Sequence, residues 1–353
     1  MHMADALLSP VVGITMNALS ITAIGVTAAK IKKAELSEKT VPLMGVAGAM
    51  VFAGQMINFA IPATGSSGHI GGGMMLAGLL GGGPAFLSIA AVVIIQCLFF
   101  ADGGLLALGS NIFVIGAIPC LLMYPLVFKP LLKSGVSYRR LTIASIVAGV
   151  AGIELGALGV VILTLVSGIT ALPFGTFALL MFPIHFVIGI FEGIITAAVL
   201  CFIYKMRPEI IEAALMGGKA DAAQWSKHAD TGRQSEVVDA VRRGSRLGGV
   251  SINKVIIALA IITTITGGIL SLFVSQNPDG LEWSISRTAN GFSGAENINA
   301  AILPDYKIPS DPENVAGAPV SGVVGSVITF MIAGAAGFVI TKMKKNKKAK
   351  DNG

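Results

Sequence analysis

The chain has 353 residues, of which 54% are hydrophobic and only 12% are charged, about half the charged fraction of a soluble domain. This composition excludes a soluble globular protein and indicates an integral membrane protein. The net charge of +6 does not indicate a nucleic-acid partner, because the basic residues stand at the ends of apolar runs and in the tail KMKKNKKAK.

The apolar runs predict the membrane helices. A helix needs about 20 apolar residues to cross a bilayer, and the stretch 70–101 is too long for one crossing, so GGGP at 81–84 divides it into two. We predict an all-α integral membrane protein with a seven-helix substrate-binding bundle and a two-helix module, about nine transmembrane helices in all. Their approximate ranges are 8–29, 41–61, the two halves of 70–101, 104–128, 141–167, 174–204, 252–274 and 319–341.

Basic residues predict which helix ends face the cytoplasm. The segments KIKKAELSEK, KPLLKSGVSYRR and KMRPE are rich in lysine and arginine, which favours the cytoplasmic side. With an extracytoplasmic N-terminus, they share one side only if 70–101 crosses twice. PATGSSGH and ADGG are then outside and the polylysine C-terminus is inside. Residues 206–250 are polar and are interpreted as a cytoplasmic linker, and the polar loop 275–318 of the module 251–353 is predicted to lie outside.

No catalytic signature accompanies these helices. The stretch GGGMMLAGLLGGGP lacks the lysine and hydroxyl residue of a phosphate-binding loop, and neither GxSxG nor HExxH occurs. The cysteines Cys97, Cys120 and Cys201 lie in apolar runs without ligand spacing and are interpreted as small buried hydrophobic residues. The sequence therefore indicates a protein that is not an enzyme and that is powered by a partner or a gradient.

The dipeptide Met1-His2 has the chemistry of a metal chelate. No basic segment precedes the first apolar run, so we expect the chain to keep its start. The α-amine and the amide nitrogen of His2 close a five-membered ring around a metal, and that amide and the imidazole Nδ1 close a six-membered ring. Amide nitrogens lose their proton to Ni(II), Cu(II) or Co(II), and planar nitrogen coordination favours nickel or copper over zinc, magnesium or calcium.

His69 is the predicted fourth ligand. It lies in PATGSSGHIGGG, an extracytoplasmic turn whose glycines let the backbone approach a bound ion. The alternative is a histidine without function in a surface loop. His228 lies in the polar linker and is predicted to be solvated.

Four further polar residues are predicted to lie near this site. His185 precedes Glu192 by seven residues, which places both on one helix face; they either orient the ligands or form a hydrogen-bonded pair that packs helices. Asp5 and Asp102 are carboxylates on the outer side, where each could hold an imidazole or attract a cation.

Four ordered motifs resemble one protein family. MHMADALLSP, GSSGHIGGG, FFADGGLLALGSNIF and HFVIGIFEGIITAAVL are similar to motifs of the CbiM and NikM substrate-specific components of energy-coupling factor transporters for cobalt and nickel. QNPDGLEWSI at 276–285 resembles the small two-helix PDGLE component, similar in role to NikN or CbiN. The whole chain thus resembles a fused M–N protein, with Ala6 where the family usually has glycine.

This resemblance implies a substrate-binding membrane domain over 1–205 and a NikN-like module over 251–353. It implies a metal bound by the amine of Met1, the amide and imidazole of His2, and His69, which are the atoms named by the chelate argument. The implied partners are a coupling transmembrane protein and two cytoplasmic ATPase subunits in a prokaryotic cell membrane. Ni(II) or Co(II) is then a transported substrate, and no catalytic cofactor is implied.

Several functions compete on the sequence alone. The leading one is energy-coupled uptake of a divalent transition metal, with nickel favoured over cobalt by planar nitrogen coordination and by the PDGLE-type module. Cobalt uptake for cobalamin synthesis is the first alternative. An ion-coupled metal carrier without ATPase partners is disfavoured, because only Glu154 and Glu192 offer an intramembrane relay. A membrane enzyme is disfavoured by the lack of a nucleophile–base pair.

Overall fold

The structure, a computed structural model, describes most of the chain. The described residues are 2–34, 40–170, 172–216, 251–288, 301–308 and 316–351. Met1, His228, the predicted linker beyond residue 216 and parts of the predicted loop 275–318 lie outside these ranges. We call residues 2–216 the first module and residues 251–351 the second module.

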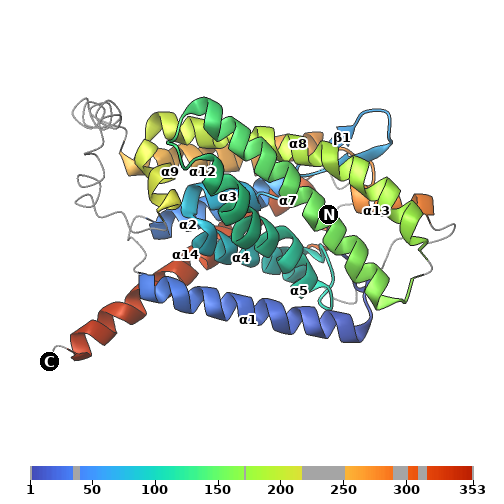
Figure 1. Cartoon of the computed structure of the whole chain (residues 1–353), viewed down its shortest axis with the longest axis horizontal. Coiled ribbons are helices and arrows are strands. Elements are labelled where there is room, and N and C mark those ends of the chain that lie inside the picture. Colours follow the sequence, from blue (N-terminus) through green and yellow to red (C-terminus); the bar gives the residue numbers. More distant parts are fainter. Residues whose placement is uncertain are drawn as a thin grey trace.

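The described chain is almost entirely helical (Figure 1), which confirms the predicted all-α membrane fold. One small antiparallel sheet pairs β1 (Phe59–Ile61) with β2 (Ser66–Gly68). Short 3₁₀ turns are η1 (Asp5–Leu7), η3 (Leu270–Phe273) and η4 (Pro304–Tyr306), and η2 (Ile112–Phe128) is wound as a π-helix. The α-helices are α1 (Pro10–Ala34), α2 (Thr40–Gln55), α3 (Gly73–Leu80), α4 (Gly82–Phe100), α5 (Leu108–Asn111), α6 (Lys129–Leu131), α7 (Tyr138–Ser167), α8 (Phe174–Met206), α9 (Pro208–Leu215), α12 (Ile252–Gly268), α13 (Gly280–Thr288) and α14 (Gly317–Asp351).

Seven helices in the described ranges are long and apolar enough to cross a membrane. Two of the nine predicted crossings correspond to shorter helices, α2 and α3. The predicted helix 41–61 ends at Gln55, and its last residues form β1. Helix α3 has eight residues, about 12 Å or less than half of a hydrocarbon core. The non-helical segment 69–72 precedes it, and such backbone is tolerated at membrane depth where protein surrounds it. The predicted break between the third and fourth helices occurs at Gly81, with φ at 80°.

Glycines allow the closest helix contacts. A Cβ added at Gly193 on α8 would lie 2.5 Å from the Cα of Ile146 on α7. A Cβ added at Gly322 on α14 would lie 2.2 Å from the carbonyl oxygen of Gly267 on α12. Small residues let helices approach each other in lipid, where van der Waals packing contributes strongly to association. Helices α12 and α14 also pack against α2, so the second module lies directly against the first.

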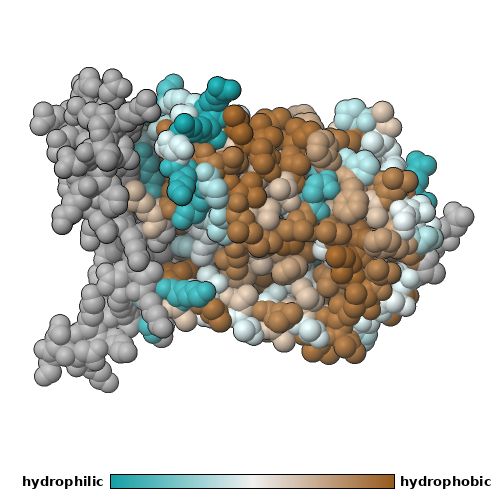
Figure 2. All heavy atoms as spheres, in the orientation of Figure 1, coloured by the Kyte–Doolittle hydropathy of each residue, from teal (hydrophilic) through white to brown (hydrophobic). Residues whose placement is uncertain are grey.

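The outer surface of the helices is apolar. Helix α1 lies along one edge of the molecule (Figure 1), and its Val11, Ile14 and Ile21 side chains are largely exposed. Figure 2 shows that apolar residues cover much of one face of the molecule, with hydrophilic residues gathered mainly toward one end. This distribution suits a surface in contact with lipid.

The first module extends into the predicted linker. Residues 208–215 form α9, whose Ile210, Ile211 and Ala214 are buried, and the Tyr124 hydroxyl donates to the carbonyl of Ala214 at 2.8 Å. The predicted boundary at residue 205 therefore falls before the last packed helix. The predicted linker is polar as a whole, but α9 at its start is amphipathic, and its apolar residues lie on one helical face that packs against the bundle.

Candidate metal centre

The N-terminal segment lies inside the first module. Met3 is fully buried and Leu7 is buried beside the core. The backbone N–H of Met3 donates to Oδ1 of Asn111 at 2.7 Å, and Nδ2 of Asn111 donates to the carbonyl of Met3 at 3.1 Å. Asp5 accepts from the backbone N–H of Ala107 at 3.0 Å. These contacts fix the backbone next to His2 before any ion is bound.

The imidazoles of His2 and His69 are stacked. Their ring centroids are 5.5 Å apart and their planes differ by 17°. The structure thus brings together the two histidines that the sequence assigns to the metal. Nδ1 of His69 donates to the carbonyl of Ile70 at 3.0 Å, because a carbonyl can only accept. The lone pair of the neutral His69 ring is therefore on Nε2.

Two glutamines determine which nitrogen of His2 carries the proton. Nε2 of Gln55 donates to the carbonyl of Gly71 at 2.7 Å, so the Oε1 of Gln55 is left to accept. It accepts from Nε2 of Gln96 at 2.8 Å, and Oε1 of Gln96 in turn faces Nε2 of His2 at 3.2 Å. Because Nε2 of Gln96 is the donor to Gln55, the Oε1 of Gln96 is an acceptor, and Nε2 of His2 must therefore donate to it. We call this series of hydrogen bonds, from Gly71 through Gln55 and Gln96 to His2, the relay. The neutral His2 ring then has its lone pair on Nδ1.

Asp102 faces Nδ1 of His2. Its Oδ1 lies 3.1 Å from Nδ1 of His2, and the His2 side chain is only 5% exposed. Burial lowers the pKa of His2, against the charge of Asp102, which raises it. Nδ1 of His2 is thus within hydrogen-bonding distance of a carboxylate oxygen. The negative charge of Asp102 favours a proton or a metal cation at this nitrogen.

The segment that carries His69 is held by Glu192. The carboxylate accepts from the backbone N–H of Gly71 at 2.8 Å and from that of Gly72 at 3.0 Å. Gly72 has a φ of 72°, and a Cβ there would lie 2.4 Å from Val51. The position therefore requires glycine. Glu192 from α8 and Gln55 from α2 thus hold one peptide segment from opposite sides.

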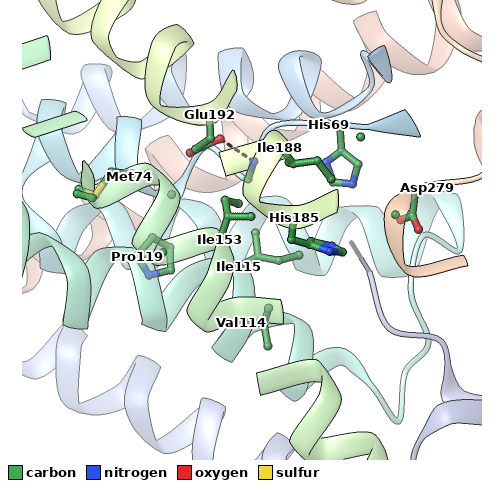
Figure 3. Close-up of a pocket in the computed structure, with 17 residues that line it drawn as sticks. His69, Met74, Val114, Ile115, Pro119, Ile153, His185, Ile188, Glu192 and Asp279 are labelled. Carbon is green, nitrogen blue, oxygen red and sulfur yellow. Dashed lines mark hydrogen bonds between the residues drawn. The ribbon is translucent and has the colours of Figure 1, made fainter. Parts of the chain in front are cut away.

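The second module reaches the same place. The carbonyl of Pro278 accepts from the backbone N–H of Ser67 at 2.8 Å, and that of Asn277 accepts from the Ser67 hydroxyl at 2.8 Å. Asp279 follows and caps α13 by accepting from the N–H groups of Leu281 and Glu282 at 2.8 and 2.9 Å. A cavity beneath this turn is lined by His69, His185, Glu192, Met74 and Asp279 (Figure 3).

His185 and Glu192 do not pair with each other. Nδ1 of His185 donates to the carbonyl of Met181 at 2.8 Å, while Glu192 binds the backbone of Gly71 and Gly72. Nε2 of His185 is buried without a hydrogen-bond partner in the described part of the chain. Figure 3 shows its ring on the side of the cavity nearest Asp279. Of the two sequence interpretations, the hydrogen-bonded pair is wrong.

Sequence reasoning finds part of this centre. Asp102 faces an imidazole, as one of its two interpretations has it, whereas Asp5 binds backbone. The sequence does not point to Gln55 or Gln96, because single amides inside apolar runs form no motif. Asn111 lies within FFADGGLLALGSNIF, but an amide in that motif gives no sign that it binds the backbone of Met3. No three His, Cys, Asp or Glu side chains cluster as a metal site within the described ranges. A metal at His2 and His69 would therefore need backbone nitrogens as well.

Comparisons with known proteins point to one family. The family model CbiM, the cobalt uptake substrate-specific transmembrane region, matches residues 2–210, and the PDGLE domain matches residues 253–342. A putative fused nickel transport protein NikMN of Archaeoglobus fulgidus is 30% identical over 97% of this chain and 98% of its own length. A putative metal transport protein of Haloquadratum walsbyi is 38% identical over 60% of this chain and 93% of its own length.

A solved structure of a metal transporter is also similar to this chain. The crystal structure of a truncated transition metal transporter superposes with a TM-score of 0.51 at 30% identity, over 58% of this chain and 99% of that chain. The CbiM match covers more than half of the sequence, and it confirms the resemblance that the four motifs predict. The chain is a multi-pass membrane protein that belongs to the CbiM family of metal transport components and carries a PDGLE domain after the CbiM region.

Proposed function

We propose that this chain is the substrate-binding subunit of an energy-coupling factor transporter that takes up a divalent transition metal, nickel in preference to cobalt. The metal ligands are the amine of Met1, the amide and Nδ1 of His2, and Nε2 of His69. A coupling membrane protein and two ATPase subunits supply the energy. The site faces the outside of a prokaryotic cell, and the basic helix ends and the C-terminus face the cytoplasm.

The orientation of the two imidazole lone pairs carries this proposal. The relay from the carbonyl of Gly71 makes Nε2 of His2 a donor and leaves the lone pair on Nδ1. Nδ1 is the nitrogen that closes a six-membered chelate ring with the amide of its own residue. The other lone pair is on Nε2 of His69. One amine, one amide and two imidazoles form a planar four-nitrogen set, which suits Ni(II).

Two relatives support the choice of substrate. The Archaeoglobus fulgidus relative, which matches over nearly the full length, is described as a putative fused nickel transport protein NikMN. The relative from Sorangium cellulosum, described as a cobalt transport protein CbiM, covers 48% of this chain at 30% identity. The proposal therefore places nickel first and cobalt second.

Titration calorimetry on purified protein tests the site. Protein that starts at Met1 is expected to bind Ni(II) tightly. Protein whose Met1 α-amine is acetylated is expected to lose tight binding, because the acetylated nitrogen no longer supplies the amine donor of the five-membered ring. His69→Ala is expected to lose tight binding too. His228→Ala, in the polar stretch of the sequence, is the control. Full affinity in the acetylated protein contradicts the chelate.

Metal uptake tests the transport cycle. Cells that express the chain with its coupling protein and ATPase subunits are expected to accumulate nickel, and excess cobalt is expected to compete weakly. An ATPase variant that binds but does not hydrolyse ATP is the control. Uptake that continues unchanged without active ATPase contradicts energy-coupling factor transport and favours an ion-coupled carrier.

A further inference from the structure

A second segment of the second module lies beside the metal centre. In residues 301–308, the backbone N–H of Leu303 donates to the carbonyl of Phe99 at 3.0 Å. The ring of Tyr306 stacks on Phe100 with centroids 4.8 Å apart and planes 17° apart. The segment is thus anchored at the outer end of α4, the helix that also carries Gln96.

The hydroxyl of Tyr306 connects this segment to His2. It donates to Oδ2 of Asp102 at 2.5 Å, and Oδ1 of the same carboxylate lies 3.1 Å from Nδ1 of His2. Burial and the charge of Asp102 both raise the pKa of Tyr306, so the hydroxyl keeps the proton that it donates. A continuous chain of polar contacts therefore runs from the second module to the expected ligand atom.

The backbone around Tyr306 is strained. Asp305 and Tyr306 have φ values of 51° and 60°, the left-handed region that costs roughly 1–2 kcal/mol for a residue with a Cβ. Two such residues in succession form the turn that points the phenol at Asp102. Backbone strain of this kind is characteristic of positions where geometry serves function.

We propose that Tyr306 is a positioning residue of the metal centre, acting through Asp102. This inference rests on the proposed function. Oδ1 of Asp102 lies 3.1 Å from Nδ1 of His2, the nitrogen that closes the proposed chelate ring, so the carboxylate places negative charge beside a cation bound there. Tyr306 holds Oδ2, so Oδ1 stays aimed at the ion. The second module thereby contributes to metal affinity without supplying a ligand.

The test is Ni(II) titration of Tyr306→Phe in the full chain with a free N-terminus. Phenylalanine keeps the stacking on Phe100 and removes only the hydroxyl. Loss of an outer partner of a metal ligand costs about 10–100-fold in affinity, and a loss in this range is expected. The matched control is Tyr204→Phe, which removes a hydroxyl near the C-terminal end of α8 that donates to the carbonyl of Val136 at 3.3 Å.

A double mutant separates positioning from simple anchoring. If Tyr306 acts through Asp102, the double variant Asp102→Asn/Tyr306→Phe binds Ni(II) with the same affinity as Asp102→Asn alone. The visible absorption of bound Ni(II) is then also the same in the single and the double variant. An equal loss in both backgrounds means that the hydroxyl only seats the segment, which overturns the inference. Wild-type affinity in Tyr306→Phe also overturns it while leaving the proposed function intact. If the unmodified chain binds neither Ni(II) nor Co(II), the proposed function fails first, and the inference fails with it.

Discussion

Glu192→Ala is expected to destabilise the protein and to loosen the segment that carries His69. The carboxylate accepts from the backbone N–H groups of Gly71 and Gly72, and alanine leaves both without this partner. Each buried donor left unsatisfied costs about 1–3 kcal/mol. Removing the carboxylate also removes its own desolvation cost, so the expected loss is at the lower end of the combined range, about 2–3 kcal/mol.

Thermal unfolding in detergent and Ni(II) titration measure the two effects separately. We expect a lower unfolding temperature for Glu192→Ala and an affinity at least about tenfold weaker, or about 1.4 kcal/mol. Glu154→Ala is the matched control, because Oε1 of Glu154 on α7 has no hydrogen-bond partner in the described structure; its removal is expected to cost nothing. If Glu192→Ala is as stable as Glu154→Ala and binds Ni(II) like the unmodified chain, the anchoring argument is refuted.

Three more predictions follow from the centre. Gln96→Leu is expected to weaken Ni(II) binding about 10–100-fold, because the proton on His2 is no longer fixed; unchanged affinity in calorimetry contradicts the relay. Gly72→Ala is expected to cost about 2–4 kcal/mol in unfolding experiments, since its Cβ meets Val51. Gly65 has a similar φ but open space around it, so Gly65→Ala is expected to cost about 1 kcal/mol; equal losses contradict the steric part. Ni(II) affinity is expected to rise from about pH 6 to pH 9, because the amine and the amide lose protons on binding; a flat profile contradicts an amide ligand.

The sequence predicts the membrane fold because hydropathy and charge decide it. Apolar runs and basic flanks follow from the thickness and the electrostatics of a bilayer, and GGGP marks the break at Gly81. The errors of the predicted helix ranges also have a physical cause. The apolar run 57–61 suits a helix and a strand alike, so hydropathy extends α2 beyond Gln55 and misses β1.

Local chemistry in the sequence predicts the chelating residues, but it does not predict the side chains that surround them. Met1 and His2 are neighbours, so their ring sizes can be worked out from the sequence. Gln55 and Gln96 are 41 positions apart, and Asp102 and Tyr306 are 204 apart. No spacing rule connects such residues, because only the packing of α2, α4 and the second module brings them together.

The peptide around Gly71 links two helices mechanically. Its N–H is held by Glu192 on α8, and its C=O is held by Gln55 on α2. Any sliding of α2 against α8 must therefore rotate this glycine or break one of the two bonds, and His69 is only two residues away. Helix α2 is also the surface on which α12 and α14 pack. The helices of the second module are therefore connected, through α2 and the Gln55 side chain, to the peptide segment that carries the imidazole facing His2.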